Sequence, residues 1–206
     1  MYRASSGKPL LPFDGVASGR AAIILAACAS QRMGAPKALL PWGGSTLLGY
    51  AIQQARAADV SEVVVVLGPA TRDVQVAATT VFNPDPETGR SASIRLGAAA
   101  LETDPSAIVV QSVDQPVTSD ILELLYRAVV DSTDVVLPIY RGRRGHPVCV
   151  SGRLLPELQT VTEAEQGLRA VVRRHADHLV EVTTNSESVL RNLNDPAAYA
   201  AARAEQ

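Results

Sequence analysis

Residues 21–46 read AAIILAACASQRMGAPKALLPWGGST, and this stretch carries most of the information in the chain. The apolar run 21–27 predicts a buried strand that opens into a loop of small residues. Two cations, Arg32 and Lys37, follow, each close to a residue that bends the backbone. Such a loop lets the backbone approach a polyphosphate while the cations neutralise it. Taken singly, each cation also fits an ordinary strand-to-helix turn with solvated charges. The complete string favours phosphate binding.

A longer pattern within this stretch resembles a family signature. The chain reads Leu-Ala-Ala-Cys at 25–28, Arg-Met-Gly at 32–34 and Pro-Lys at 36–37. This resembles the signature of the molybdopterin-guanylyl and molybdopterin-cytidylyl transferases, within the superfamily of sugar-phosphate nucleotidyltransferases. The family has a glycine where this chain has Cys28, and segment 39–48 (LLPWGGSTLL) is similar to the cytidylyl branch. The resemblance runs from about residue 21 to residue 199, which is nearly the whole chain.

The resemblance implies a set of contacts with a nucleoside triphosphate. Lys37 is expected against the α-phosphate and Arg32 against the β- and γ-phosphates. Together with Asp114, these are the expected catalytic residues. Segment 83–97 (NPDPETGRSASIRLG) resembles the part of the family that covers the nucleotide, and Arg95 within it fits a solvated helix charge equally well. The expected nucleotide-binding residues are Ala26, Ala27, Cys28, Ala29, Ser30, Gly89, Ser91 and Ser93.

Asp114 is the strongest single candidate for a metal ligand. It closes the apolar run 108–114 (IVVQSVD), and Pro116 fixes the turn that follows. In open α/β sheets, ligands bind beyond the carboxyl ends of the strands, and Mg²⁺ prefers one or two protein oxygens plus substrate phosphates. An isolated aspartate at this point also fits a helix cap or a surface residue. Its match to the Asp-Gln-Pro motif of the family favours the metal role.

The resemblance implies a second metal ligand near the C-terminus and residues on the acceptor side. In related nucleotidyltransferases a C-terminal Asp or Asn supplies the second oxygen. Asn194 is the expected match here and Asp195 its competitor, in a turn (NLNDP, 192–196) that also fits a cap of the last helix. Gln115 and His146, the latter in a Gly-His-Pro match, are expected on the acceptor side. His146 also fits a histidine that only forms hydrogen bonds at a strand start.

Composition bounds the class of protein. The chain has 206 residues, 47% of them hydrophobic, which suits one α/β domain, expected over 21–206 after a flexible extension 1–20. The formal net charge of -2 gives no basic excess, so nucleic acid is not an expected partner. No apolar run reaches the roughly 18 residues needed to span a membrane, and segment 1–20 lacks the apolar core of a signal peptide. We therefore expect a cytoplasmic protein. Disulfides are rare in such proteins, so none is expected, and neither is a zinc site.

Strand-like and helix-like segments alternate, which predicts a mainly parallel sheet covered by helices. The expected fold is a three-layer α/β/α, Rossmann-like nucleotidyltransferase domain. The expected strands are 21–27, 62–67, 107–113, 134–140, 146–150 and 179–184. The expected helices are 47–58, 71–79, 91–102, 119–131, 165–176 and a segment from 196 onward. RGRRG at 141–145 predicts a hairpin between two of these strands.

The function that the resemblance implies is transfer of CMP from CTP to the phosphate of molybdenum-bound molybdopterin, with Mg²⁺ as cofactor and release of pyrophosphate. A recipient molybdoenzyme is a possible partner. Within the same class, the donor could be GTP or the acceptor another phosphorylated metabolite. In a different class, the chain could be a non-catalytic nucleotide- or cofactor-binding chaperone for molybdoenzyme maturation. A dinucleotide-binding site and a P-loop are not expected, because neither GxGxxG nor GxxxxGK[ST] occurs in the chain.

Overall fold

The fold is built around β1 (Arg20–Ala26), which lies between two parallel neighbours, β4 (Glu62–Leu67) and β6 (Ala107–Ser112). The computed structural model describes residues 19–28 and 34–205. The predicted extension 1–20 therefore lies almost wholly outside the described residues. All three strands are buried on both faces, which explains why their sequences read as continuous apolar runs.

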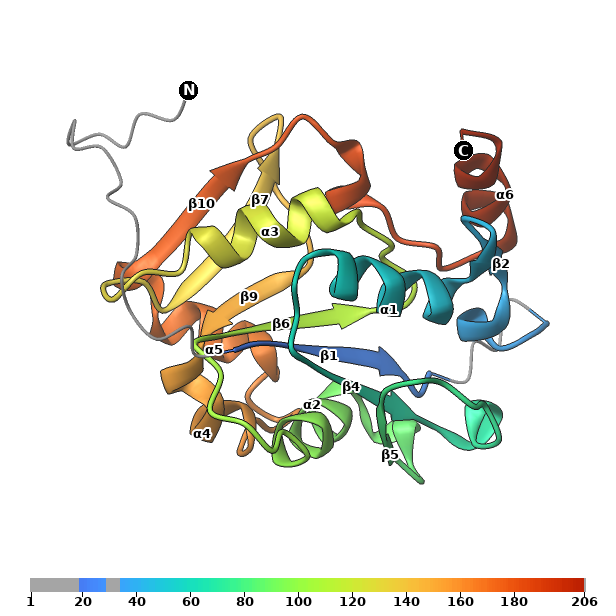
Figure 1. The fold of residues 1–206 in the computed structure, drawn as a ribbon, viewed down its shortest axis with the longest axis horizontal. Coiled ribbons are helices and arrows are strands. Elements are labelled where there is room, and N and C mark those ends of the chain that lie inside the picture. Colours follow the sequence, from blue (N-terminus) through green and yellow to red (C-terminus); the bar gives the residue numbers. More distant parts are fainter. Residues whose placement is uncertain (1–18, 29–33, 206) are drawn as a thin grey trace.

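The other strands complete a mixed, mostly parallel sheet in the order β10-β7-β9-β6-β1-β4-β5 (Figure 1). Within this sheet, the described strands that run antiparallel to their neighbours are β9, between β6 and β7, and β8, beside β7. The bounds of these strands are Thr79–Phe82 for β5, Val135–Tyr140 for β7, Arg143–Arg144 for β8, Val148–Ser151 for β9 and Leu179–Thr183 for β10.

Helices cover both faces of the sheet, so the predicted three-layer α/β/α, Rossmann-like class is confirmed. Alternate residues of β1 point into two separate apolar clusters. Ala22 and Ile24 pack in the cluster that holds α1 and α3, and Ala21 and Ile23 in the cluster that holds α2, α4 and α5. The helix bounds are Leu47–Ala57 for α1, Arg90–Ala99 for α2, Ser119–Arg127 for α3, Leu155–Leu158 for α4, Leu168–Arg174 for α5 and Pro196–Ala204 for α6.

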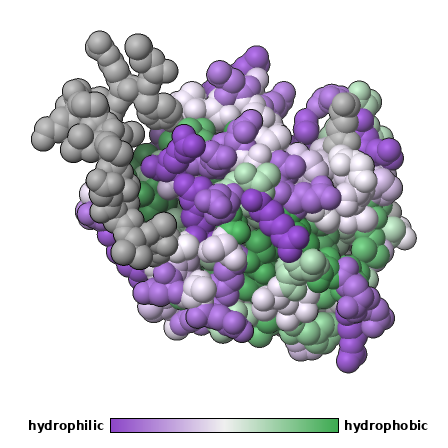
Figure 2. Space-filling model, in the orientation of Figure 1, coloured by the Kyte–Doolittle hydropathy of each residue, from purple (hydrophilic) through white to green (hydrophobic). Residues whose placement is uncertain are grey.

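Figure 2 shows hydrophilic residues across much of one face, with hydrophobic residues between them. This distribution agrees with helices that turn polar side chains outward and apolar side chains toward the sheet. Within the described ranges, no helix has both the length and the apolar character required to cross a membrane.

The predicted helix over 71–79 is wrong. The chain forms only a 3₁₀ turn, Pro69–Thr71, and then reaches β5, which the sequence analysis missed. The Thr71 hydroxyl explains the stop, because it accepts a hydrogen bond from Gly68 N and donates one to Ala26 O. The turn is thereby tied to the end of β1. Strand β5 lies at the edge of the sheet, and three of its four residues are exposed, so no apolar pattern marked it.

Two further differences have backbone causes. The helix expected over 165–176 is shorter, because Gln166 (φ 70°) and Gly167 (φ 55°) have backbone angles that a right-handed helix excludes. The two strands expected around 141–145 do pair, as β7 with β9, but this segment also forms the short strand β8. The turn between β7 and β8 is made by Arg141 and Gly142, which both have positive φ, as a two-residue hairpin turn requires.

A small hairpin, β2 (Pro41–Trp42) with β3 (Ser45–Thr46), connects the loop after β1 to helix α1. Thr46 caps α1 by accepting a hydrogen bond from Gly49 N. Trp42 is buried and contacts the rings of Tyr50 in α1 and Tyr199 in α6. The C-terminal helix is therefore packed against the segment that follows the first loop, although the two lie at opposite ends of the sequence.

Candidate active site

The candidate site lies at the carboxyl ends of β1 and β6, on the side of the sheet where β2 and α6 are found (Figure 1). Asp114 follows the end of β6 by two residues. Lys37 opens the 3₁₀ turn Lys37–Leu39, and Asn194 stands just before α6. Three segments that are far apart in the sequence therefore supply the centre of the site.

The Lys37 ammonium links these segments. Its Nζ lies 3.2 Å from Asp114 Oδ2 and 2.7 Å from Asn194 Oδ1. Lys37 is only 6% exposed and Asp114 only 5% exposed. A buried lysine is stable when paired and hydrogen-bonded to oxygens in this way. The structure thus brings together the expected catalytic lysine and both oxygens expected to hold a metal.

The backbone near Asn194 explains why that residue, and not Asp195, reaches Lys37. Leu193 N donates a hydrogen bond of 2.9 Å to Asp114 O, which holds the C-terminal segment against the end of β6. The Asp195 carboxylate turns the other way and accepts a hydrogen bond from Ala198 N, which caps α6. The helix-capping role considered for this turn therefore belongs to Asp195.

The oxygen atoms of this site fit a divalent cation. Asp114 Oδ1 is buried and has no hydrogen-bond partner among the described residues. Such an unsatisfied carboxylate oxygen is costly unless a ligand completes it. A second oxygen, the uncharged Oδ1 of Asn194, contacts the same lysine. Across residues 19–28 and 34–205, no group of three or more His, Cys, Asp or Glu side chains forms a metal cage. The arrangement therefore suits a cation that takes its other ligands from a substrate, as Mg²⁺ does.

The loop after β1 is described only in part. Ala26 and Ala27 are buried at the end of the strand, and Cys28 is exposed. Gly68, after β4, approaches Ala27 so closely that an added Cβ would lie 2.3 Å from Ala27 O. Three expected site residues, Ala29, Ser30 and Arg32, lie outside the described residues.

The segment expected over the nucleotide forms the start of α2. Gly89 has φ 111°, a backbone angle that favours glycine, and a Cβ there would meet the Glu163 carboxylate. Glu163 Oε2 accepts hydrogen bonds from Ser91 N (3.1 Å) and Ser91 Oγ (2.6 Å), and these bonds lower the pKa of Glu163. Ser93 Oγ accepts from Asn83 Nδ2. Both serine hydroxyls are thus bonded within the protein, and their contact with a nucleotide stays a prediction.

The expected acceptor-side residues lie beside this centre. Gln115 is buried, and its carbonyl accepts a hydrogen bond from the Gln111 side chain. His146 is fixed through its backbone N, which donates to Val189 O at 2.7 Å. Burial, followed by the charges of Arg90 and Arg169, lowers the pKa of His146, while Asp114 acts in the opposite direction. The imidazole is therefore kept neutral near pH 7.

Sequence reasoning missed two residues of this region. Arg90, the first residue of α2, places Nη2 3.8 Å from Asp114 Oδ2. Its only sequence signal was its place directly after Gly89. Glu163 had no signal at all, because the serine it binds is 72 positions away. Arg95, which was left open, donates to Val161 O and so has a structural partner.

Comparison with known proteins now identifies the family. A model of the MobA-like NTP transferase domain matches residues 22–179. This chain belongs to the MobA-like NTP transferase family. Membership makes it a nucleotidyltransferase-type protein with a nucleoside triphosphate as substrate, and it confirms the kind of family that the signature in 25–37 resembled.

Proteins that resemble the chain carry different names. Nicotine blue oxidoreductase of Paenarthrobacter nicotinovorans is 33% identical over 168 residues, covering 74% of this chain and 80% of the relative. Molybdenum cofactor cytidylyltransferase of Escherichia coli (strain K12) is 29% identical over 178 residues, covering 82% and 88%. The Rv0371c protein of Mycobacterium tuberculosis H37Rv shares the fold, with a TM-score of 0.77 at 24% identity, covering 91% of this chain and 98% of that one. Its structure in a complex with manganese matches with a TM-score of 0.72.

Proposed function

We propose that this protein transfers CMP from CTP to the phosphate of molybdenum-bound molybdopterin and releases pyrophosphate. The observation that carries the proposal is the convergence of Lys37, Asp114 and Asn194 at the carboxyl end of β6. A buried cation beside two oxygens that fit a divalent metal suits phosphoryl-type transfer, in which positioning and charge neutralisation supply most of the catalysis. The 29% identity to the Escherichia coli cytidylyltransferase supports the choice of substrates.

Each residue has a proposed role. Lys37 lies against the α-phosphate and stabilises the charge that builds there in the transition state. Arg32, outside the described residues, holds the β- and γ-phosphates of the leaving pyrophosphate. The main-chain amides from Ala27 onward line the triphosphate. The acceptor phosphate is already ionised, so neither His146 nor another base has to remove a proton from it.

Asp114 and Asn194 would hold the divalent cation, and we propose Mg²⁺. When bound, such a cation supplies neutralisation of phosphate charge. The unsatisfied Asp114 Oδ1 supports this assignment. The related fold of Rv0371c has been solved with manganese, which prefers oxygen ligands as magnesium does. Lys37 now contacts both oxygen-bearing residues, so its ammonium has to shift as the nucleotide and the cation enter.

The preference for CTP rests on Ala27. In the families that this chain resembles, guanylyl enzymes carry a glycine at this position and cytidylyl enzymes an alanine. Ala27 directly follows β1 and is buried, and Gly68 lies against its backbone, so the backbone that carries its methyl group has little freedom to move away. A methyl group there narrows the base pocket and disfavours the larger purine. GTP as donor, or another phosphorylated metabolite as acceptor, is the alternative within this class.

Two alternatives come from other classes. A non-catalytic chaperone needs no paired lysine and metal-binding carboxylate, so the Lys37–Asp114 contact argues against it. The 33% identity to nicotine blue oxidoreductase favours oxidoreductase activity as a second candidate. An oxidoreductase needs an electron carrier, and the chain has no GxGxxG after its first strand.

One experiment separates these functions. Purified protein is incubated with molybdopterin, MgCl₂ and each of CTP, GTP, ATP and UTP, and pyrophosphate release is measured. We expect release with CTP that requires the acceptor and is lost in Lys37→Ala. Release with GTP in preference to CTP would select the guanylyl alternative. Binding of nucleotide without pyrophosphate release would select the chaperone. A parallel assay of dye reduction with reduced nicotinamide cofactors tests the oxidoreductase.

A further inference from the structure

Arg90 brings a second cation to the carboxylate that Lys37 contacts. Asp114 Oδ2 lies 3.2 Å from Lys37 Nζ and 3.8 Å from Arg90 Nη2. The two cations differ sharply in exposure: the Lys37 side chain is 7% exposed and the Arg90 side chain 58% exposed. Lys37 therefore lies in the interior of the site. Most of the Arg90 side chain is exposed to the solvent beside the same carboxylate.

This guanidinium has donors available for a ligand. Arginine presents five N–H groups in a planar fork that matches the oxygens of a phosphate. Its contact with Asp114, at 3.8 Å, is longer than a direct hydrogen bond and is an ion pair only. An exposed ion pair of this kind contributes little by itself. The fold therefore places Arg90 at the site, and the N–H donors of its guanidinium stay available to a ligand.

A further arginine, Arg169, acts on the same region as Arg90. Gly167, which precedes α5, lies against the Ser91 side chain, so the starts of α2 and α5 meet, and Arg169 is in the first turn of α5. The charges of Arg90 and Arg169 both act on His146 and lower its pKa further after burial has done so. Lys37 and Arg90 therefore bring two positive charges to the single carboxylate of Asp114. An anionic ligand would balance this excess.

We propose that Arg90 binds the phosphate of the acceptor substrate and positions it beside Asp114. This inference rests on the proposed function. Lys37 is the proposed contact for the donor phosphate, whereas the charge of Arg90 acts on His146, which is expected on the acceptor side. In the reaction, an oxygen of the bound acceptor phosphate forms a bond to the α-phosphorus of the donor. The bond from that phosphorus to the bridging oxygen breaks, and pyrophosphate leaves with the electron pair. No proton has to move.

The test measures phosphate binding while the donor sites are filled. Wild type, Arg90→Gln and Arg90→Lys are saturated with MgCl₂ and a CTP analogue that has a methylene group between the α- and β-phosphates. Inorganic phosphate and phenyl phosphate are then titrated by calorimetry. Arg127→Gln is the matched control, because Arg127 is an exposed arginine that pairs with Glu123 on its own helix, α3. Thermal unfolding of each variant verifies that it is folded.

We expect Arg90→Gln to weaken binding of both phosphate probes by about tenfold or more, the loss typical of a charge-assisted contact. Arg90→Lys should retain part of the affinity, since it keeps the charge but not the fork. The affinity for the CTP analogue should stay unchanged in all variants, and Arg127→Gln should behave as wild type.

Three results would overturn the assignment. The first is no phosphate binding by wild type in the presence of the bound analogue. The second is equal phosphate binding by wild type and Arg90→Gln. The third is a loss of affinity for the analogue in Arg90→Gln, which would place Arg90 on the donor. Failure of wild type to bind the analogue at all would instead remove the proposed nucleotidyl transfer, and this inference with it.

Discussion

Lys37 Nζ lies 3.2 Å from Asp114 Oδ2, although 77 positions separate the two residues in the chain. Both side chains are buried, and Asn194 Oδ1 completes the contact at 2.7 Å from the same ammonium. The end of β6, the turn Lys37–Leu39 and the segment before α6 meet at this point. The relationship matters because the lysine and a cation held by the neighbouring carboxylate would bring two sources of positive charge to one phosphate group.

Asp114→Asn tests the metal assignment. The substitution keeps the shape of the side chain but removes the charge that would hold a divalent cation, so Mg²⁺-dependent transfer should fall by about 10²-fold or more. Mn²⁺ binding measured by electron paramagnetic resonance should weaken in parallel, while circular dichroism shows the fold to be intact. Asp195→Asn is the control, because that carboxylate caps α6. Wild-type turnover in Asp114→Asn would show that the carboxylate does not hold the catalytic metal.

Lys37→Ala tests the proposed transition-state contact. The lost cation faces charge that develops only during transfer. The value of kcat should therefore fall by a larger factor than the affinity for the nucleotide. Comparison of kcat with the dissociation constant of CTP, measured by the fluorescence of Trp42, separates the two effects. If CTP affinity and kcat/KM fell equally with kcat unchanged, Lys37 would contribute only ground-state binding.

Ala27→Gly tests the choice of base. Removal of one methyl group should widen the base pocket and raise the kcat/KM ratio of GTP to CTP. A single methyl group contributes about 1–3 kcal/mol to such discrimination, so the shift should be marked but not absolute. Steady-state rates with both nucleotides measure it. Equal use of CTP and GTP by wild type, or a preference for GTP, would contradict the cytidylyl assignment.

Cys28→Gly tests the departure from the family signature. Asp59, Arg141 and Gln166 are the described non-glycine residues with positive φ, and Cys28 is not among them. Cys28 therefore has a backbone conformation that needs no glycine, and it is exposed rather than packed. We expect the substitution to change CTP affinity by less than about tenfold, or 1.4 kcal/mol. A larger gain would mean that the natural cysteine crowds the triphosphate.

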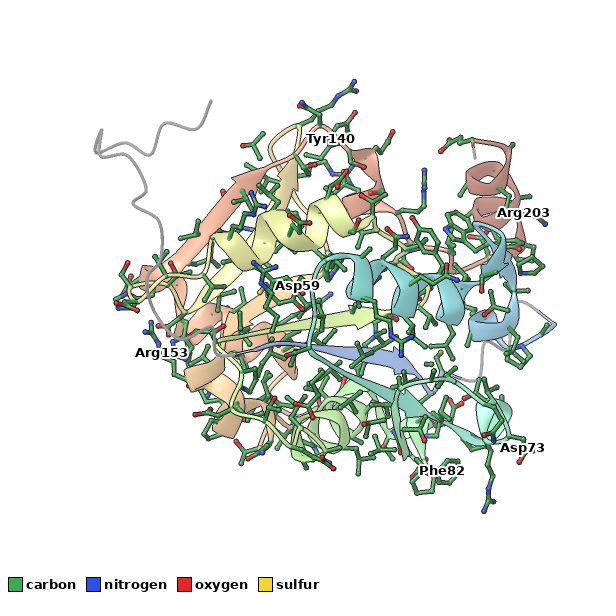
Figure 3. All side chains as sticks on the ribbon, viewed as in Figure 1. Asp59, Asp73, Phe82, Tyr140, Arg153 and Arg203 are labelled. Atoms are coloured by element: carbon green, nitrogen blue, oxygen red, sulfur yellow. The ribbon has the colours of Figure 1, made fainter. Side chains whose placement is uncertain are left out.

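His175 makes stability depend on pH at the opposite edge of the sheet. Its Nδ1 lies 2.9 Å from Asp134 Oδ2 and its Nε2 2.7 Å from Glu157 Oε1. Burial favours the neutral ring, but the hydrogen bonds to Glu157 and Asp134 outweigh it and raise the pKa of His175. Arg153 belongs to the same cluster, because it forms an ion pair with Asp134. Figure 3 shows Arg153 far from Arg203 of α6. The cluster thus acts on stability and not on the candidate site.

The sign of that dependence follows from the raised pKa. Stabilisation by His175 is complete below the pKa of the unfolded state, near ~6.5, and is lost as pH rises through the higher pKa of the folded state. The free energy of unfolding of wild type should exceed that of His175→Gln by about 1–3 kcal/mol at pH 5.5, as for hydrogen bonds to charged groups. Urea titrations at pH 5.5 and pH 9 should show this difference shrinking. A constant difference would mean that His175 is neutral in the folded protein at both values.

The sequence predicted the central strands and most helices because their signals are local. Strands β1, β4 and β6 are buried on both faces, so each appears as an unbroken apolar run. Strand β5 carries no such run, because it is an exposed edge strand. No strand was therefore predicted there, and the segment before it, 71–79, was wrongly assigned to a helix.

The type and order of most elements, and the residue types on which the proposed phosphate chemistry depends, were determined by the sequence itself, since periodicity and local motifs encode them. Tertiary structure alone decided that Asn194 faces Lys37 while Asp195 caps α6. It also decided that Glu163 binds Ser91 and that Arg90 lies beside Asp114. These contacts join segments many residues apart. They depend on how the ends of the strands and helices meet at one edge of the sheet, which no local pattern specifies.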